Sequence, residues 1–404
     1  MFIEEKLKTE IKESADVFVA GGGVAGIAAA LSAAREGKRV LLAERGFVLG
    51  GLATAGLVTV YLPLCDGYGR QVSFGLAEEL LRLSIEDYTD GERGYPNWIA
   101  DETPTHRTKD DPRFAVNFNP ALFAIAAERL LLAEGVKILY GTTVAAVKSE
   151  GDRIQAVIVE NKSGRSAIAA TAFVDATGDA DLAHLAGIPC KTFSRGNILA
   201  AWYYFYGKSG YALKMHGYAE TPEAALGKEK QEFLADRRFS GLSVEENSEF
   251  CEMAHASIYE DVKKMQKSDP SYQPVTVATI PQLRMTRRVI GAYTLAEREV
   301  HTPFADSVGM VSDWRRRGPV FEVPFGTLYS PEKKNLIFAG RCTSVEDDMW
   351  DIMRVIPCCA VTGEAAGAAA AICDDFSTLD VGKLQGILAS RGIRLHESEL
   401  SPLK

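Results

Sequence analysis

DVFVAGGGVAGIAAALSAAREGKRVLLAE, residues 16–44, is the stretch of sequence that decides the fold. Residues 16–20, which are apolar after Asp16, predict a short buried strand. Residues 27–35 favour a helix, and residues 39–44 predict a second buried strand. A strand–helix–strand unit of about 30 residues is the building block of α/β nucleotide-binding folds. The stretch therefore predicts a parallel sheet with helices packed on it.

The glycines between the first strand and the helix follow a G-x-G-x-x-G pattern, with Gly21, Gly23 and Gly26. Gly21 allows the tight turn out of the strand, Gly23 lets a pyrophosphate approach the backbone, and Gly26 lets helix and strand pack closely. The N-terminus of the helix that follows the glycines presents free N–H groups and partial positive charge to such a phosphate. This pattern predicts a dinucleotide site.

Glu44 ends the second strand, eighteen residues after Gly26. A carboxylate in that position accepts hydrogen bonds from ribose hydroxyls. A glycine-rich turn without a ligand explains the glycines alone, but it does not explain the strand, helix, strand and acid in register. Up to this residue, FAD and NAD fit the pattern equally well.

The rest of the chain predicts more sheet, a helix that Asn119 caps and Pro120 begins, and a region of different character. Strands are expected at 136–140, 142–149, 154–160, 166–174 and 335–340, with a hairpin around residues 161–164. Residues 360–373 predict a small-residue helix that packs on a sheet. Aromatic residues cluster at 202–206, and charged helical sequence fills 222–268.

We therefore predict an α/β protein in which a Rossmann-like domain, with a parallel sheet, helices and a β-meander, carries an inserted second α+β domain. The predicted first part of the Rossmann-like domain is 1–189. The inserted substrate or cap domain is 190–330. Residues 331–404 return to the first domain with a strand, a helix and a C-terminal tail.

Composition excludes several classes of function. The net charge of −9 argues against nucleic acid as a partner. Seven cysteines without a C-x-x-C pair argue against a disulfide framework or a zinc site and favour the cytoplasm. The six histidines show no metal-ligand spacing, so no metal is expected. No run approaches the roughly 18 apolar residues of a membrane span, so no membrane partner is expected, and the oligomeric state is not legible.

Beyond Glu44 the sequence resembles the FAD-dependent oxidoreductase family with a glutathione-reductase-like FAD fold. The resemblance rests on blocks that follow one another in family order over most of residues 16–373. They are residues 44–51, 52–58, 174–181, 284–291, 321–324, 335–342 and 354–359.

The resemblance implies FAD as the cofactor and a set of contact residues. Gly50 and Gly51 would bring bare backbone against the flavin ring, and the helix that begins near Pro357 would direct N–H groups to its N1/C2 edge. The implied FAD contacts are Gly21, Gly23, Val24, Ala25, Gly26, Glu44, Arg45, Gly50, Gly51, Thr54, Val144, Ala176, Thr177, Gly178, Gly340, Arg341, Arg354, Pro357 and Cys358.

Several of these residues have a second interpretation. Val144 is either on the adenine side or an ordinary buried strand residue. Arg341 and Arg354 either contact pyrophosphate or a substrate carboxylate, or lie exposed on loops. Cys358 and Cys359 are either a redox pair or small core residues, and adjacent cysteines bridge only with strain.

The catalytic residues are not identified by the sequence. Arg284, Arg287 and Arg288 form a basic cluster that either grips an anionic substrate or lies on a solvated strand face. Where family members often carry a His, residues 345–353 hold Glu346, Asp347, Asp348 and Asp351. These four carboxylates either face the substrate side of the flavin or form a solvated acidic loop. The catalytic candidates are Asp347, Asp348 and Arg287.

The resulting hypothesis is an FAD-dependent oxidoreductase that transfers a hydride between an unidentified small-molecule substrate and flavin N5. One alternative is a flavin-binding protein that uses FAD structurally or as a sensor. Another is an NAD-only dehydrogenase, which explains residues 16–44 but none of the later blocks.

Overall fold

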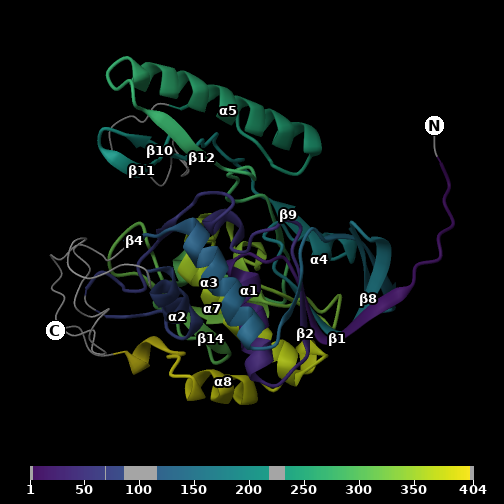
Figure 1. Cartoon of the computed structure of the whole chain (residues 1–404). Coiled ribbons are helices and arrows are strands. Elements are labelled where there is room, and N and C mark those ends of the chain that lie inside the picture. Colours follow the sequence, from purple (N-terminus) through teal and green to yellow (C-terminus); the bar gives the residue numbers. More distant parts are fainter. Residues whose placement is uncertain (1–2, 69, 86–115, 218–232, 401–404) are drawn as a thin grey trace.

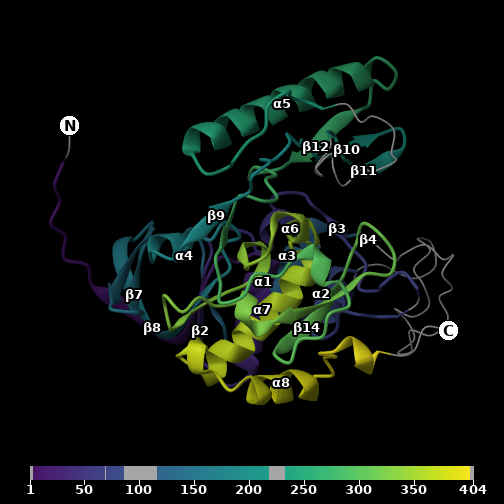
Figure 2. The same cartoon turned by 180° about the vertical axis from the view of Figure 1, so that it is seen from behind.

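The computed structural model describes residues 3–68, 70–85, 116–217 and 233–400. The chain forms a larger α/β part and a smaller part that lies on one side of it (Figure 1, Figure 2). Residues 88–113, whose polar and proline-rich sequence predicts a long loop, all lie outside the described residues.

A seven-stranded sheet forms the centre of the larger part, in the order β5-β2-β1-β8-β7-β6, with β16 paired to the end of β8. The pairs of β1 with β2 and β8, of β2 with β5, and of β8 with β16 are parallel. β6 and β7 run antiparallel into β8 as a meander. The strands are β1 (Ile11–Ala20), β2 (Val40–Ala43), β5 (Lys137–Leu139), β6 (Thr143–Glu150), β7 (Arg153–Asn161), β8 (Gly164–Asp175) and β16 (Leu336–Phe338).

Both faces of the sheet are buried, because successive side chains of a strand point to opposite faces. In β1, Val17 and Val19 belong to the core under the helices, while Phe18 and Ala20 belong to a second core on the meander side. β1 begins five residues earlier than predicted, because residues from Ile11 onward pair with β8 although their side chains are largely exposed.

Two small-residue helices cover one face of the sheet in close contact. A Cβ at Gly363 of α7 (Ile356–Ile372) would lie 2.3 Å from the carbonyl oxygen of Ala25 in α1 (Val24–Arg35). A Cβ at Gly367 would lie 2.2 Å from the carbonyl oxygen of Ala29. The predicted packing of a small-residue helix on this domain is confirmed.

Further helices and strand pairs complete the larger part. Asn119 accepts hydrogen bonds from the amides of Ala121 and Leu122 and so caps the predicted helix. The helices are α2 (Leu76–Ser84), α3 (Pro120–Ala133), α4 (Asp181–Leu185), α6 (Asp347–Met353) and α8 (Val381–Ser390). The two-stranded pairs are β3 (Val60–Tyr61) with β4 (Val116–Asn117), β9 (Cys190–Thr192) with β13 (Arg287–Val289), and β14 (Ser307–Ser312) with β15 (Val320–Pro324).

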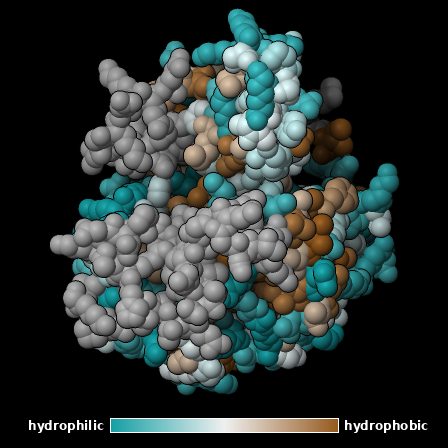
Figure 3. All heavy atoms as spheres, turned by 60° about the vertical axis from the view of Figure 1, so that its left-hand side comes forward, coloured by the Kyte–Doolittle hydropathy of each residue, from teal (hydrophilic) through white to brown (hydrophobic). Residues whose placement is uncertain are grey.

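The smaller part consists of a three-stranded sheet and one long helix. Its strands are β10 (Tyr203–Gly207), β11 (Gly210–Lys214) and β12 (Gln273–Val277), in the order β11-β10-β12, and its helix is α5 (Val244–Gln266). Its core includes Tyr203, Phe239 and Phe250. In the space-filling view the smaller part projects from the larger part, and hydrophobic residues gather on the surface of the larger part below it (Figure 3).

The core residues suggest a different domain boundary from the predicted 190–330. Met285, Leu295, Val311 and Phe321 belong to the core of the larger part. We therefore propose a smaller second domain, at about residues 197–283, with the rest of the predicted insert built into the larger domain.

Candidate functional site

The turn from β1 into α1 needs glycine at two positions for reasons internal to the protein. Gly21 has a φ of +97°, and a Cβ there would lie 2.6 Å from the carbonyl oxygen of Ala176. A Cβ at Gly26 would lie 1.8 Å from the carbonyl oxygen of Gly21. These two glycines bring α1 against the sheet, as the pattern predicts.

At Gly23, by contrast, no contact within the protein requires a glycine. Its φ of −68° suits any residue, it precedes α1 without a side-chain cap, and a Cβ there would meet no atom within 4 Å. The open space lies at the N-terminus of α1, where unpaired N–H groups and the helix dipole favour an anion. The turn therefore fits the diphosphate of a dinucleotide.

The carboxylate of Glu44 lies beside this turn. One of its oxygens accepts a hydrogen bond from the Gly22 amide at 2.7 Å, and the other accepts one from the Gly46 amide at 2.6 Å. Each carboxylate oxygen can accept a further bond, so Glu44 can still bind ribose hydroxyls. The sequence missed its second role, which is to hold the loop.

We expect Glu44→Ala to weaken FAD binding by about 1.5–3 kcal/mol, because charge-assisted hydrogen bonds to ribose are lost. The variant also leaves the Gly22 and Gly46 amides without their acceptor, so its apo-protein should melt at a lower temperature. Titration of apo-protein with FAD measures the first effect. An FAD affinity equal to that of the wild type would show that Glu44 is not the ribose acid.

The loop with the double glycine lies directly against the first glycine turn. The Gly50 amide donates to the Gly22 carbonyl oxygen at 2.8 Å, and a Cβ at Gly51 would lie 3.3 Å from the Cα of Gly23. The Thr54 hydroxyl is directed back to the Leu49 carbonyl oxygen. The predicted phosphate and flavin segments are thus adjacent, and Thr54 holds the shape of the loop.

The segment after β8, residues 175–181, forms another side of the candidate site. Asp175 is fully buried and accepts hydrogen bonds from the Thr177 amide and hydroxyl and from the Ala183 amide. Gly178 lies against Arg341, whose guanidinium pairs with Asp179 at 2.8 Å. The predicted turn therefore meets Arg341 at the carboxyl end of the sheet, where open α/β sheets bind ligands.

Asp175 is expected to make stability depend on pH. Burial raises the pKa of its carboxyl from 3.8 to about 6, against the hydrogen bonds from Thr177 and Ala183. Between these values the folded state binds more protons than the unfolded state, so its stability falls as the pH rises through this window. We expect the wild type to lose about 1–3 kcal/mol relative to Asp175→Asn between about pH 4 and about pH 7. Urea unfolding of both proteins measures this difference, and a constant difference would contradict it.

The N-terminus of α7 lies close to the turns that follow β1 and β8. Val355 precedes the helix and Pro357 lies in its first turn. A Cβ at Gly340 would lie 2.8 Å from that of Ala25, and the Gly340 amide donates to Thr362 in α7. Burial raises the pKa of both the Cys358 and the Cys359 thiol, to about 12 for Cys359, which supports a packing role for them rather than a redox role.

Val144 and Arg45 lie at the Glu44 end of the site. The Thr142 amide donates to the Glu44 carbonyl oxygen at 3.0 Å, which places the start of β6, and with it Val144, beside this loop. Val144 is half-buried and packs against the core on the meander side of the sheet. Its contact with adenine remains a proposal. Arg45 is exposed and lines the cavity described below.

The acid segment, residues 345–353, does not supply a carboxylate without a partner. Glu346 pairs with Arg298, Asp348 pairs with Arg195, and Asp347 accepts hydrogen bonds from the amide and hydroxyl of Ser194. The expectation of a loop is wrong, because Asp347–Met353 forms the short helix α6. A catalytic role for Asp347 or Asp348 stays a proposal that these contacts do not favour.

Asp351 differs from the other three carboxylates because it is buried. Its Oδ1 accepts from Arg354 at 2.6 Å, and the guanidinium of Arg354 lies over the ring of Trp314. The side chain of Arg354 is only 8% exposed, so of its two interpretations the exposed position on a loop is wrong. We propose that Arg354 fixes the α6–α7 junction rather than contacting FAD.

The basic cluster is not a solvated face. Arg284 and Arg288 are buried, over the rings of Trp202 and Trp350, and burial lowers the pKa of Arg288. Arg287 pairs with Asp181 at 2.6 Å and donates to the Asp179 carbonyl oxygen. Together with Arg341, Arg287 thus braces the 175–181 turn, which suggests a structural role.

A cavity of about 380 Å³ lies between the two parts of the protein. The larger part contributes Arg45, Leu52, Asp179 and Arg341. Helix α5 contributes Val244, Asn247, Ser248 and Cys251. Sequence reasoning missed the α5 residues, because a charged helix shows no sign of which side meets a distant loop.

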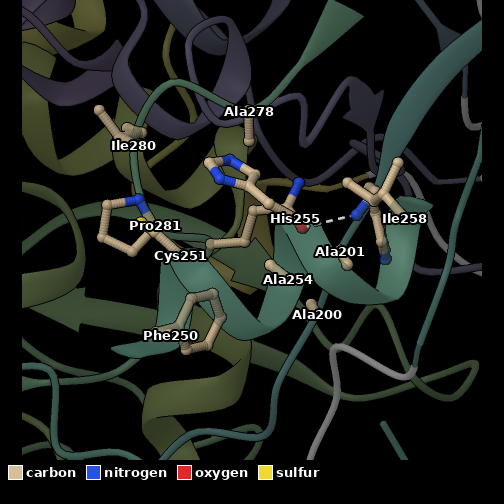
Figure 4. Close-up of a pocket in the computed structure, with 12 residues that line it drawn as sticks. Ala200, Ala201, Phe250, Cys251, Ala254, His255, Ile258, Ala278, Ile280 and Pro281 are labelled. Carbon is tan, nitrogen blue, oxygen red and sulfur yellow. Dashed lines mark hydrogen bonds between the residues drawn. The ribbon is translucent and has the colours of Figure 1, made fainter. Parts of the chain in front are cut away.

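A smaller cavity of about 20 Å³ adjoins the first and shares Cys251, Ile280 and Pro281 with it. In Figure 4, Cys251 and His255 of α5 point toward the segment that carries Ala278, Ile280 and Pro281. The volume of this smaller cavity admits about one water molecule.

Hydrogen bonds fasten the smaller part to residues 55–59. The Thr279 amide donates to the Ala55 carbonyl oxygen at 2.8 Å, and the Gln282 side chain donates to the Gly56 carbonyl oxygen at 2.6 Å. The hydroxyls of Tyr204 and Thr59 lie 2.7 Å apart. The segment that resembles the flavin loop is therefore the one to which the smaller part attaches.

Fold and site together are those of a dinucleotide-binding protein. The model of the family described as FAD dependent oxidoreductase matches residues 16–199 and 238–388. The chain belongs to this family, and the resemblance noted in the sequence is confirmed. It is an FAD-dependent oxidoreductase and FAD is its cofactor. No curated protein sequence matches the chain.

Solved structures similar to the chain include a geranylgeranyl bacteriochlorophyll reductase-like protein from Thermoplasma acidophilum. That protein is 12% identical, with 94% of this chain and 84% of that chain covered and a TM-score of 0.44. An anhydrotetracycline hydroxylase from Streptomyces rimosus is 15% identical, with 94% of this chain and 66% of that chain covered and a TM-score of 0.45. A p-nitrophenol 4-monooxygenase from Pseudomonas putida is 11% identical, with 94% and 81% covered and a TM-score of 0.44.

Among the described residues, no single helix has the length and apolar composition to cross a membrane. Helices α6 and α7 satisfy that test only when taken together, and they are bent by 90° at their junction.

Proposed function

We propose that the protein oxidises or reduces a small molecule that lies between the flavin ring and the smaller part. Bound FAD would supply the flavin N5 atom, which exchanges a hydride with a carbon atom of the substrate. The protein positions the substrate, excludes water and sets the local charge.

The observation that carries the proposal is the attachment of the smaller part to residues 55–59. These residues follow the double-glycine loop, and three hydrogen bonds join them to Tyr204, Thr279 and Gln282. The attachment of the smaller part beside the loop that we propose for the flavin ring supports the assignment of residues 197–283 as a substrate domain. A small-molecule substrate suits an enclosed site of this kind.

The N-terminus of α7 supports a role in stabilising reduced flavin. If its first N–H groups face the N1/C2 edge of the ring, their partial positive charge favours the anionic reduced form. The chain contributes the helix dipole and, through Pro357, a first turn that is already shaped.

A flavin-binding protein without turnover is the second candidate. The observation that favours it is that each carboxylate of the acid segment has a partner, although Oδ2 of the buried Asp351 accepts no hydrogen bond. The NAD-only alternative does not agree with FAD as the cofactor. The cytoplasmic location remains a prediction from the cysteine content.

Anaerobic mixing of the FAD-loaded protein with amines, hydroxy acids and NAD(P)H tests the proposal. We expect one of these classes to bleach the visible absorption band of the flavin, and air to restore it. If no compound bleaches the band while dithionite does, the second candidate gains support.

A further inference from the structure

We infer that Asn247 of α5 binds the ribityl chain of FAD, so that the cofactor ties the smaller part of the protein to the larger one. The inference rests on FAD as the cofactor and does not depend on the proposed substrate chemistry. It assigns a cofactor contact to a residue outside every block of the family resemblance.

The first step is the place of the cavity along the dinucleotide. Arg45 follows Glu44, the residue proposed for the adenosine ribose, and Leu52 follows the double glycine proposed for the flavin ring. Both line the cavity that α5 closes from the other side. The stretch between Arg45 and Leu52 therefore corresponds to the middle of FAD, which consists of the diphosphate and the ribityl chain.

The second step is an acceptor without a donor. The Oδ1 atom of Asn247 is buried and has no hydrogen-bond partner among the described residues. Buried amide oxygens in proteins are ordinarily paired, so an unpaired one in a residue that lines a cavity points to a ligand. The neighbouring Ser248 donates its hydroxyl proton to the Val244 carbonyl oxygen at 2.7 Å and does not serve Asn247.

The third step is the chemistry of the two groups in the middle of FAD. Diphosphate oxygens only accept hydrogen bonds, so they do not satisfy Oδ1. The ribityl hydroxyls donate, and they therefore match the amide oxygen. The cations at the cavity, Arg45 and Arg341, are the groups suited to the diphosphate.

The consequence is a coupling between cofactor binding and the smaller part. A ligand that contacts both sides of a cavity binds the closed arrangement more tightly than an open one. It therefore stabilises the closed arrangement. FAD should therefore reduce local opening of the first turns of α5, which lie over the cavity.

The test replaces Asn247 with Leu, which has a similar size and no acceptor. We expect the apo-protein of Asn247→Leu to be as stable as the wild type or more so, because an unpaired buried oxygen is removed. FAD binding should weaken by about two- to tenfold, measured by fluorescence titration of the apo-protein. ADP, which has a diphosphate but no ribityl chain, should bind both proteins equally.

A control and a second measurement complete the experiment. Glu252→Leu changes an exposed position of α5 that lines neither cavity, and it should leave the FAD affinity unchanged. Hydrogen exchange should show that FAD slows the amides of residues 248–251 in the wild type and slows them less in Asn247→Leu. Unchanged FAD affinity in Asn247→Leu, or an equal loss for ADP, would overturn the inference.

Discussion

Gly23→Val is expected to abolish FAD binding while the apo-protein stays folded. The Cβ at this position enters open space in the protein, so the fold tolerates the side chain apart from about 1 kcal/mol for a poorer N-cap. The same space is where we propose that the diphosphate approaches the amides of α1. Displacing it should cost about 3 kcal/mol or more, which is over a hundredfold in affinity.

Gly26→Val is the matched comparison, because it changes the same pattern at a position that the protein itself fills. A Cβ there would lie 1.8 Å from the Gly21 carbonyl oxygen, so α1 would have to move from the sheet. We expect this variant to lose about 3 kcal/mol or more of folding free energy. Circular dichroism melting and FAD titration together separate the two variants. A Gly23→Val protein that binds FAD normally would show that the turn is not the diphosphate site.

Arg354→Ala should lower the free energy of unfolding by about 3–5 kcal/mol, because it leaves the buried carboxylate of Asp351 without its main partner. Asp351 is 1% exposed and Arg354 is 8% exposed. Arg315 is the other cation near Asp351, at 3.9 Å, which is too long for a direct hydrogen bond. Denaturant unfolding measures the loss.

Two further variants show whether burial causes that loss. Arg354→Met combined with Asp351→Leu replaces the pair by apolar side chains of similar size and should recover most of the stability. Arg298→Ala breaks the pair with Glu346. The two side chains are 72% and 46% exposed, so the free energy of unfolding should hardly change. A loss in Arg354→Ala no larger than that in Arg298→Ala would contradict the account of the α6–α7 junction.

The features that the sequence predicts well are those carried by local patterns. The unit at residues 16–44, the meander around residues 161–164 and the Asn119 cap each depend on neighbours within a few residues. Gly23 adds a distinction that only the structure provides. Gly21 and Gly26 serve the fold, whereas Gly23 has no steric reason to be glycine.

The features that the sequence does not predict depend on partners far along the chain. The first half of β1 is strand because it pairs with β8. The acid segment forms ion pairs with Arg195 and Arg298 and accepts a hydrogen bond from Ser194. These partners lie about 50 to 150 residues away, so the sequence does not show that the carboxylates are paired. Ion pairs of this kind leave no periodic signal in a sequence.

The smaller part shows the same limit. Tyr203, from the aromatic cluster at 202–206, lies in the core of this part. Which side of α5 faces the larger part depends on the strand order β11-β10-β12 and on the attachments to residues 55–59. Asn247 therefore had no distinguishing mark among the polar residues of its helix.

The most direct test of the central claim is the FAD content of the purified protein after reconstitution. The account predicts a yellow protein with one FAD per chain, released intact on denaturation, and a colourless but folded Gly23→Val variant. A wild-type protein that melts cooperatively, stays colourless and takes up no FAD would contradict the account.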